Sequence, residues 1–297
     1  MVSSFKSGFI AIIGPPNVGK STFINAVVGE KVSIVSPKPQ TTRNRVIGIK
    51  TLSQGQLIFV DTPGTHRTRK RFNRHLVEIA RSSFRESDAI LVMVEASKSY
   101  IDKEFDYIRK GLQQTKNPVL LLINKVDLVK KEALLPLIEA YSSSYHFQEI
   151  FPVSALTGLG VDRIEQSLLD YLPEGPRYFP ESMYTDLPER FLAGEIIREK
   201  IFFLIQKEVP YSITVEVDQL SEGDDGIIFI RASIWVEKKS QKGILIGKQG
   251  RMLKEIGTRA RKEIEGFLNS KVYLELWVTV KRNWTLNEAA IRQSLAL

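Results

Sequence analysis

The chain contains no cysteine and only three histidines. Without cysteine it can form neither a disulfide framework nor a thiolate metal site. The histidines, His66, His75 and His146, are too scattered along the chain to indicate a metal-binding cluster. These absences favour a protein that works in a reducing compartment, and we therefore expect a cytoplasmic location.

Long hydrophobic runs are also missing. The only early apolar run, Phe9–Ile13, is shorter than the core of a signal peptide and leads directly into a glycine-rich loop. A membrane-spanning helix needs roughly 20 consecutive apolar residues, which the chain does not offer. We therefore expect neither a targeting segment nor an integral membrane span.

The 297 residues are 43% hydrophobic and 26% charged, as is ordinary for a globular protein. This length exceeds what one hydrophobic core usually serves, so two domains are expected. The net charge of +8 favours a polyanionic partner. The positive charge is concentrated in Lys238–Lys262, where Glu255 is the single acid, and in an acid-free cluster at Arg67–Arg74.

The first half of the chain, up to about Leu172, alternates short β-branched runs with longer amphipathic stretches. This alternation is typical of an α/β domain with a mostly parallel sheet. A turn at Ser53–Gln56 predicts a hairpin, which would add one antiparallel edge strand. The predicted strands are Phe9–Ile13, Arg45–Leu52, Leu57–Asp61, Ile90–Val94, Val119–Ile123 and Ile150–Val153.

Residues 14–21 match the phosphate-binding pattern G-x-x-x-x-G-K-[ST] at every fixed position. In such a loop main-chain N–H groups cradle phosphate oxygens, Lys20 supplies charge to the β- and γ-phosphates, and the Ser21 hydroxyl can coordinate Mg²⁺. The residues predicted to contact the nucleotide here are Gly14, Asn17, Val18, Gly19, Lys20, Ser21 and Thr22. The pattern therefore predicts a nucleoside triphosphate site after the first strand.

Two later segments supply the remaining metal and γ-phosphate contacts. Asp61 ends the third strand and places a carboxylate near Mg²⁺, while the N–H of Gly64 can meet the γ-phosphate. A polar, proline-punctuated loop follows the first helix, and we favour Thr42 in it over Thr41 as the residue that ligates Mg²⁺. We expect slow intrinsic hydrolysis, because Thr65 stands where Ras-like GTPases carry a water-orienting glutamine.

The choice of base is predicted by Asn124-Lys125-Val126-Asp127, which follows the fifth strand. The carboxylate of Asp127 can accept hydrogen bonds from N1–H and the 2-amino group of guanine, which adenine does not offer in that pattern. Ser154-Ala155-Leu156, after the sixth strand, could add a main-chain N–H to the guanine oxygen. Four elements in this order favour GTP over ATP.

Glycine, proline and aromatic residues crowd Leu172–Pro180, a composition typical of a domain boundary. Beyond it the pattern predicts helix, strand, strand, helix, helix, strand, and this α-β-β-α-α-β order resembles a type II KH domain. We predict a GTP-binding domain at residues 1–173, a linker at 174–186, a KH domain at 187–282 and a tail helix at 283–297.

A second glycine-and-lysine loop lies at Gly243–Gly250 and leads into a predicted helix. Its spacing does not fit the nucleotide pattern, because one spacer residue is missing and Gln249 stands where a metal-ligating Ser or Thr is needed. It fits G-x-x-G, a turn that lets a nucleic-acid backbone approach closely in KH domains. The predicted RNA-binding residues are Lys242, Gly247, Lys248, Gln249, Gly250, Arg251 and Lys254. Nearby apolar residues are predicted to line a groove for unstacked bases: Ile244, Leu245, Ile246, Met252, Leu253 and Ile256.

Together these motifs resemble the Era family of GTPases over nearly the whole chain. The resemblance implies GTP and GDP with Mg²⁺ as ligands, binding of the 3′ end of small-subunit ribosomal RNA, action on the 30S subunit during its assembly, and peripheral association with the inner membrane. It also implies that Asn17 helps to hold a potassium ion, for which a turn-stabilising role is the alternative. The ending Val280–Trp284 is similar to the family's, but Thr285 departs from it. Trp284 either stacks on RNA or packs against the KH sheet.

Three other functions stay open at this level. A tRNA-modification GTPase shares first-domain motifs but usually needs a catalytic cysteine, which is absent. An RNA-binding protein that keeps GTP only as a structural ligand is disfavoured by intact Lys20, Ser21, Asp61 and Asp127. A peripheral membrane GTPase would bind lipid independently of the G-x-x-G loop. In the favoured mechanism, γ-phosphate and Mg²⁺ order the Thr42 loop and residues 61–74, and hydrolysis releases them.

Overall fold

The computed structural model describes residues 4–36, 38, 41–42, 44–61, 86–98, 101, 103–113, 115–206, 209–287 and 290–291. Contacts divide the chain into two compact units. The first comprises Met1–Ser33 and Thr42–Asp186, and the second comprises Ile34–Thr41 and Leu187–Leu297. A short segment of the first half of the chain therefore belongs to the second unit.

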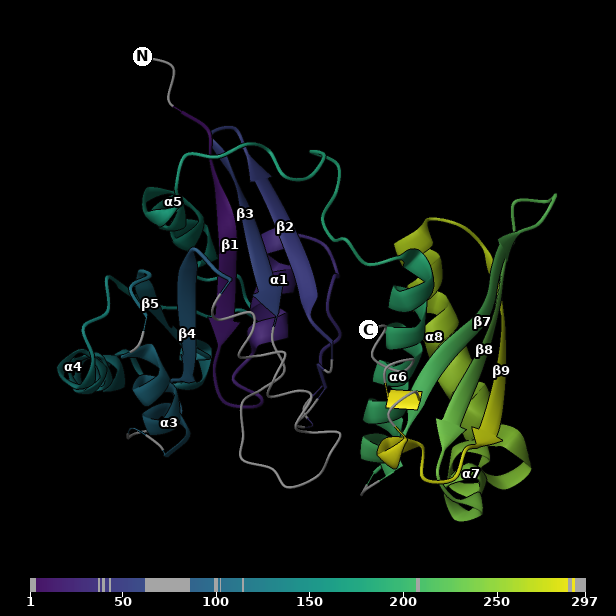
Figure 1. Ribbon diagram of the computed structural model, residues 1–297. Helices are drawn as coiled ribbons and strands as arrows, with labels where there is room; N and C mark the ends of the chain where they lie inside the picture. The colour runs from purple at the N-terminus through teal and green to yellow at the C-terminus, as the bar shows by residue number, and fades with distance from the viewer. Residues whose placement is uncertain are drawn as a thin grey trace. The chain divides into compact units, whose positions relative to one another are not determined.

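The first unit is built on a six-stranded sheet with the order β2-β3-β1-β4-β5-β6 (Figure 1). All neighbouring strands are parallel except β2 and β3, which form the predicted antiparallel hairpin. The prediction of a mostly parallel sheet with one antiparallel edge strand is confirmed. The strands are β1 (Lys6–Ile13), β2 (Val46–Leu52), β3 (Gly55–Asp61), β4 (Ala89–Glu95), β5 (Val119–Asn124) and β6 (Ile150–Pro152).

Helices cover both faces of this sheet, which is why its strands are almost continuously apolar. Alternate residues of β1 enter different cores: Ile10 and Ile12 pack with Phe23 of α1, whereas Ala11 and Ile13 belong to the core on the other face. The helices described in this unit are α1 (Lys20–Val28), α3 (Lys103–Leu112), α4 (Leu134–Ser144) and α5 (Val161–Tyr171), with 3₁₀ turns at Val126–Leu128 and Lys131–Ala133. The carboxyl ends of the strands consequently lie together at one edge, where ligands bind in such sheets.

The predicted linker is packed along the first sheet. Ser7 donates its N–H to the carbonyl of Pro173 at 3.1 Å, and Gly175 donates to the carbonyl of Phe5 at 3.0 Å. The fully buried Gln56 accepts the N–H groups of Tyr178 and Phe179, each at 3.0 Å. The proline and glycine composition indicates where the chain leaves its domain, but it does not predict these hydrogen bonds. Contacts extend the first unit to Asp186.

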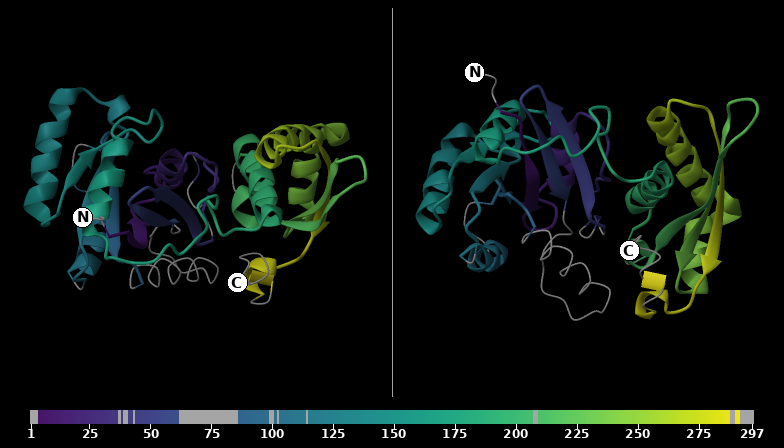
Figure 2. Two further views of the ribbon diagram at one scale, coloured as in Figure 1. Left: turned by 90° about the horizontal axis from the view of Figure 1, so that it is seen from above. Right: turned by 45° about the horizontal axis from the view of Figure 1, so that its top comes forward.

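The second unit has the predicted α-β-β-α-α-β order. Its three strands pair as β7-β8-β9, with β7 and β8 antiparallel and β8 and β9 parallel. Helices α6 and α8 lie against one face of this sheet (Figures 1 and 2). Ile256, Ala260 and Ile264 repeat every fourth residue along α8 and are fully buried in the core. The elements are α6 (Glu189–Leu204), a 3₁₀ turn (Val209–Ser212), β7 (Thr214–Glu222), β8 (Ile228–Val236), α7 (Lys239–Ile246), a 3₁₀ turn (Lys248–Gly250), α8 (Arg251–Leu268), β9 (Val272–Val280) and a 3₁₀ turn (Trp284–Leu286).

Among the helices described, none combines the length and the apolar character required to span a membrane.

Candidate functional site

The phosphate-binding loop joins β1 to α1, and two of its glycines are required by close contacts. A Cβ atom on Gly14 would lie 2.4 Å from the carbonyl oxygen of Met93. Gly19 has φ +102°, and a Cβ atom there would lie 2.3 Å from Nδ2 of Asn124. The buried Lys20 donates from Nζ to the carbonyls of Gly14 and Pro15, both at 3.0 Å. The loop is thus closed around the ammonium at the start of α1, where anions bind favourably.

Three residues that the sequence predicts as metal ligands meet in the first unit. The Ser21 hydroxyl donates to Oδ2 of Asp61 at 2.7 Å, and Oγ1 of Thr42 lies 2.8 Å from Oγ of Ser21 and 3.3 Å from Oδ2 of Asp61. Thr41 instead bonds to Ser36 and to the carbonyl of Lys38. Of the two threonines, Thr42 is thus the one whose hydroxyl lies beside Ser21 and Asp61, while its role as a magnesium ligand stays a prediction.

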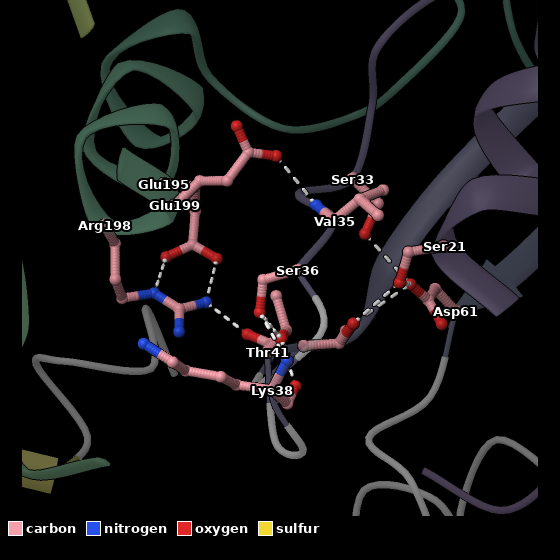
Figure 3. Close-up of polar contacts among 11 residues, drawn as sticks. Ser21, Ser33, Val35, Ser36, Lys38, Thr41, Asp61, Glu195, Arg198 and Glu199 are labelled. Carbon is pink, nitrogen blue, oxygen red and sulfur yellow. Dashed lines mark hydrogen bonds and ion pairs between the residues drawn. The ribbon is translucent and has the colours of Figure 1, made fainter. Parts of the chain in front are cut away.

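Asp61 is fully buried, and its two oxygens differ. Oδ2 accepts hydrogen bonds from hydroxyl groups that include Ser33, at 2.9 Å (Figure 3), whereas Oδ1 has no partner among the described residues. Burial raises the pKa of this carboxyl group. Ser33 was not predicted, because a lone serine between apolar residues carries no motif. Asn25 of α1 holds it in place by accepting its N–H at 2.9 Å.

Asn124 binds the protein on both sides of its amide group. Nδ2 donates to the carbonyl of Val18 at 2.7 Å, and Oδ1 accepts the N–H of Ala155 at 2.9 Å. This buried side chain therefore ties together the loops that follow β1, β5 and β6. The sequence placed Asn124 and Ala155 among the guanine contacts, but here their polar groups are engaged with each other and with Val18.

Asp127 lies in the 3₁₀ turn after β5 and is exposed. Lys125 before it adopts φ 65° and pairs with Glu95 through Nζ and Oε2, 2.9 Å apart. Ser154 is fully buried and accepts the N–H of Thr157 at its hydroxyl, while Leu156 is 79% exposed. Asn124, Ser154 and Ala155 therefore form a buried frame, and the exposed carboxylate of Asp127 is the group that could accept hydrogen bonds from guanine.

Of the remaining predicted nucleotide-site positions, the structure describes some and not others. Asn17 adopts φ 63°, a left-handed conformation that asparagine tolerates well, so a turn role explains it while potassium binding stays a prediction. Thr22 lies within α1. Gly64, Thr65 and the basic cluster Arg67–Arg74 lie outside the described residues.

The G-x-x-G turn joins α7 to α8 in the second unit. Gly247, Gln249 and Gly250 have φ of 70°, 52° and 76°. A Cβ atom on Gly247 would lie 2.7 Å from Cβ of Met252, whereas one on Gly250 would meet nothing within 4 Å. Lys248 and Gln249 between them are exposed. Gly247 is therefore required both for packing and for its backbone conformation, whereas Gly250 is required for its backbone conformation alone.

A groove of about 480 Å³ runs beside this turn, between α8 and the edge strand β9. It is lined by Gly250, Leu253, Lys254, Gly257, Thr258, Arg261, Tyr273, Leu274 and Leu276. Of the apolar residues predicted to line it, only Leu253 does so, and Leu245 and Ile256 are fully buried instead. Sequence alone missed the β9 residues, because only tertiary folding brings β9 to α8. Lys254 and Arg261 give the groove positive charge suited to a phosphate backbone.

Trp284 packs inside the second unit. It is 2% exposed, its Nε1 donates to the carbonyl of Ser212 at 3.0 Å, and its ring meets that of Trp235 edge-on with centroids 6.4 Å apart. Thr285, which departs from the family pattern, donates to Oε1 of Glu237 at 2.5 Å. Of the two roles considered for Trp284, packing is the one observed.

We expect Trp284→Ala to destabilise the second unit by about 3–5 kcal/mol, because it leaves a cavity and an unpaired Ser212 carbonyl. The exposed Trp277→Ala is the matched control and should change stability by no more than about 0.5 kcal/mol. Urea unfolding followed by tryptophan fluorescence checks this, since all three tryptophans lie in the second unit. Equal midpoints for the two variants would contradict the packing role.

Comparison with known families assigns each half of the chain to a domain family. Residues 9–125 match the family described as 50S ribosome-binding GTPase, and residues 208–285 match the KH domain family. The fold and its sites thus define a P-loop GTPase that carries a KH domain. GTPase Era of Geotalea daltonii is 52% identical over 289 residues, and GTPase Era of Geobacter metallireducens is 51% identical over 290 residues, with 97% of each chain covered in both cases. The chain belongs to the Era family of GTPases and is a GTP-hydrolysing enzyme.

Two solved structures are similar over the whole length. Era in complex with MgGDPNP and nucleotides 1506–1542 of 16S ribosomal RNA is 42% identical, has a TM-score of 0.93 and covers 98% of each chain. An Era variant of Aquifex aeolicus bound to GDP·AlF4⁻ is also 42% identical, with a TM-score of 0.94 and coverage of 98% of this chain and 99% of that one. These similarities confirm the predicted fold class and the resemblance to the Era family.

Proposed function

We propose that the first unit binds GTP with Mg²⁺ and hydrolyses it, and that the second unit binds single-stranded RNA in the groove beside the G-x-x-G turn. The observation that carries the nucleotide part is the buried Asp61. Its Oδ1 has no hydrogen-bond partner among the described residues, and its Oδ2 accepts hydrogen bonds from the hydroxyls of Ser21 and Thr42. Carboxylate and hydroxyl oxygens suit Mg²⁺. When bound, the ion would neutralise charge on the phosphates.

The protein's own residues supply the rest of the nucleotide site. On nucleotide binding, Nζ of Lys20 would donate to β- and γ-phosphate oxygens in place of the carbonyls of Gly14 and Pro15. The N–H groups of the loop and of α1 would hold the phosphates. Asp127 would select guanine while Asn124 keeps the three loops in register. No residue is assigned as a general base, so positioning and charge neutralisation account for catalysis, and slow intrinsic turnover is expected.

The RNA we propose is the 3′ end of small-subunit ribosomal RNA. The support is the positively charged groove beside Gly250, together with the relative bound to nucleotides 1506–1542 of 16S ribosomal RNA. The protein would act in the cytoplasm on the 30S subunit during its assembly, with any membrane association being peripheral. Hydrolysis would release the Thr42 loop and residues 61–74 and so change how RNA is bound.

Replacing Asp61 with asparagine tests the metal site. We expect Asp61→Asn to raise the Mg²⁺ concentration for half-maximal GTP turnover at least about tenfold, because the site loses its formal negative charge. Asp162→Asn, an exposed aspartate at the start of α5, is the matched control and should leave the Mg²⁺ dependence unchanged. An unaltered Mg²⁺ dependence in Asp61→Asn would remove this residue from the metal site.

Crosslinking tests the proposed partner. The full-length protein is irradiated with cellular RNA in its GTP- and GDP-bound forms, and the crosslinked nucleotides and peptides are mapped. We expect crosslinks between the α8 and β9 groove and the 3′ end of small-subunit ribosomal RNA, at different yields in the two forms. Crosslinks confined to other RNAs would contradict the assembly role.

A further inference from the structure

The sheet of the second unit packs against α6 and α8 on one face, and its other face is turned away from them (Figure 1). Along β8, Ile230, Ala232 and Ile234 enter the core with the helices, so the residues between them point to this outer face. At one end of the outer face Trp235 is 1% exposed, and its ring meets that of Trp284. The protein therefore covers that end with an aromatic side chain of its own.

The other end of the outer face carries two adjoining rings that are not covered. Phe229 of β8 and Tyr273 of β9 are partners in the parallel register, and their ring centroids lie 5.6 Å apart at an interplanar angle of 44°. The two residues are 41% and 59% exposed. A Cβ atom on Gly223 would lie 2.9 Å from Cε2 of Phe229, so this ring rests against the turn between β7 and β8. Single exposed aromatic residues are common, whereas apolar groups exposed side by side more often belong to an interaction surface.

Tyr273 also lines the groove beside the G-x-x-G turn. A short connection, 269–271, joins α8 to β9, so these two walls of the groove run in opposite directions. Gly257 of α8 faces Leu276 of β9, since a Cβ atom on this glycine would lie 3.4 Å from Cδ1 of the leucine. Tyr273 precedes Leu276 and therefore lies at the end of the groove away from Gly250. A chain that leaves the groove at this end meets the ring of Phe229 next.

The charges near the two rings suit a phosphate backbone. Arg261 lies on the α8 wall of the groove, and the exposed Lys271 is two residues before Tyr273. Glu275 lies on the same face, but its Oε2 is 2.7 Å from Nε of Arg231, and this ion pair offsets its charge. An RNA chain that passes the rings therefore meets cations and a neutralised carboxylate.

Trp277 marks the point where this favourable surface ends. It is 56% exposed and lies on the same face of β9 as Tyr273. Its register partner on β8 is Ser233, which donates to Oδ2 of Asp218 at 2.7 Å and pairs with Glu216 on β7. Two carboxylates near Trp277 disfavour a phosphate group there. The surface suited to RNA is thus limited to the part of the face around Phe229 and Tyr273.

Proteins that bind single-stranded RNA commonly stack its unpaired bases on exposed aromatic rings. We propose that Phe229 and Tyr273 form a base-stacking site on the outer face of the sheet, which binds a nucleotide of the RNA that leaves the groove at the end away from Gly250. A KH groove takes about four nucleotides, so this site extends the bound segment. The inference rests on the proposed function, because the groove must hold RNA for the next base to reach the rings. It assigns RNA contacts to β8, which the G-x-x-G turn does not contain.

The test uses the full-length protein and single-stranded RNAs that cover the 3′ end of small-subunit ribosomal RNA. Each RNA carries one 2-aminopurine, a base whose fluorescence falls when it stacks. We expect strong quenching at a position next to the groove-bound segment. Phe229→Val should restore the fluorescence at that position alone and should lower RNA affinity about tenfold, within the range for one stacked base. Valine favours strands, so the sheet should still form.

Two further variants serve as controls. Tyr273→Phe keeps the ring and should behave like the unchanged protein, whereas Tyr273→Val should lose the same fluorescence signal as Phe229→Val. Trp277→Val removes another exposed ring from the same face of β9, outside the groove-lining residues, and should leave both RNA affinity and the quenching pattern unchanged. Equal effects of Trp277→Val and Phe229→Val would contradict a site limited to the two rings.

Gly250→Asp separates this inference from the function it rests on. If Gly250→Asp lowers RNA affinity while Phe229→Val changes neither affinity nor quenching, the stacking site is overturned and the groove stands. If Gly250→Asp leaves RNA affinity unchanged, the proposed groove fails and the inference fails with it. Equal loss of quenching at every position, with a lower melting temperature in Phe229→Val, would show a structural role only. Self-association that Phe229→Val abolishes without changing RNA binding, measured by sedimentation, would assign the rings to a second copy of the chain and would also overturn the proposal.

Discussion

Asp127→Asn is expected to lower GTP affinity roughly 10⁴-fold and to make the protein bind xanthosine triphosphate. The exposed carboxylate would accept two hydrogen bonds from guanine, whereas an asparagine amide offers a donor that suits the 2-oxygen of xanthine. The change should alter preference without altering the fold, because Asp127 lies in a surface turn outside the buried frame formed by Asn124. Titration with fluorescent GTP and xanthosine triphosphate measures both affinities.

Asn124→Ala provides the contrast for this experiment. It removes the bonds to Val18 and Ala155 that hold three loops together, so binding of both nucleotides should weaken in parallel. A switch in preference caused by Asn124→Ala, or unchanged GTP affinity in Asp127→Asn, would show that base selection has been assigned to the wrong residue.

Gly250→Asp is expected to weaken binding of single-stranded RNA about 100-fold, equivalent to ~2.8 kcal/mol, while GTP affinity stays the same. A carboxylate there would face the phosphate backbone, and aspartate is among the residues that can adopt the positive φ of 76° found at this position. Since a Cβ atom at Gly250 meets nothing within 4 Å, the variant should fold, which could not be expected of Gly247. Anisotropy of a labelled RNA covering the 3′ end of small-subunit ribosomal RNA measures the loss.

The matched control is Gly266→Asp, farther along α8, where a Cβ atom also meets nothing within 4 Å. It adds the same charge to the same helix outside the groove-lining residues, and it should leave RNA affinity within about twofold, since a single remote charge is screened by salt. Similar losses in the two glycine variants would mean that the added charge, not the turn, is responsible. Loss of GTP affinity together with RNA affinity in a folded Gly250→Asp would contradict the division of labour between the two glycine loops.

Most of the fold could be predicted because its signals are local. Alternating apolar runs fixed the strands of the first unit, and the turn at Ser53–Gln56 identified the antiparallel edge. The order of elements after Leu187 indicated a KH arrangement, which the pairing of β8 with β9 confirms. The packing of the segment from Pro173 to Tyr184 along the first sheet could not be read in this way, because its hydrogen bonds join residues far apart in the chain.

The sequence by itself determined that this is a GTPase with a KH domain and placed the candidate nucleotide and RNA sites, since motif residues must stand at set spacings for their main-chain groups to meet phosphates. Spacing also separated the Gly14 loop from the Gly247 turn. Only the tertiary structure decided that Asn124 connects the loops that follow β1 and β6. It also decided that Tyr273, Leu274 and Leu276 complete the groove, and that Trp284 is buried. It alone brought Gln56 to Tyr178 and Phe179, because contacts between residues more than 120 positions apart depend on packing and leave no local pattern.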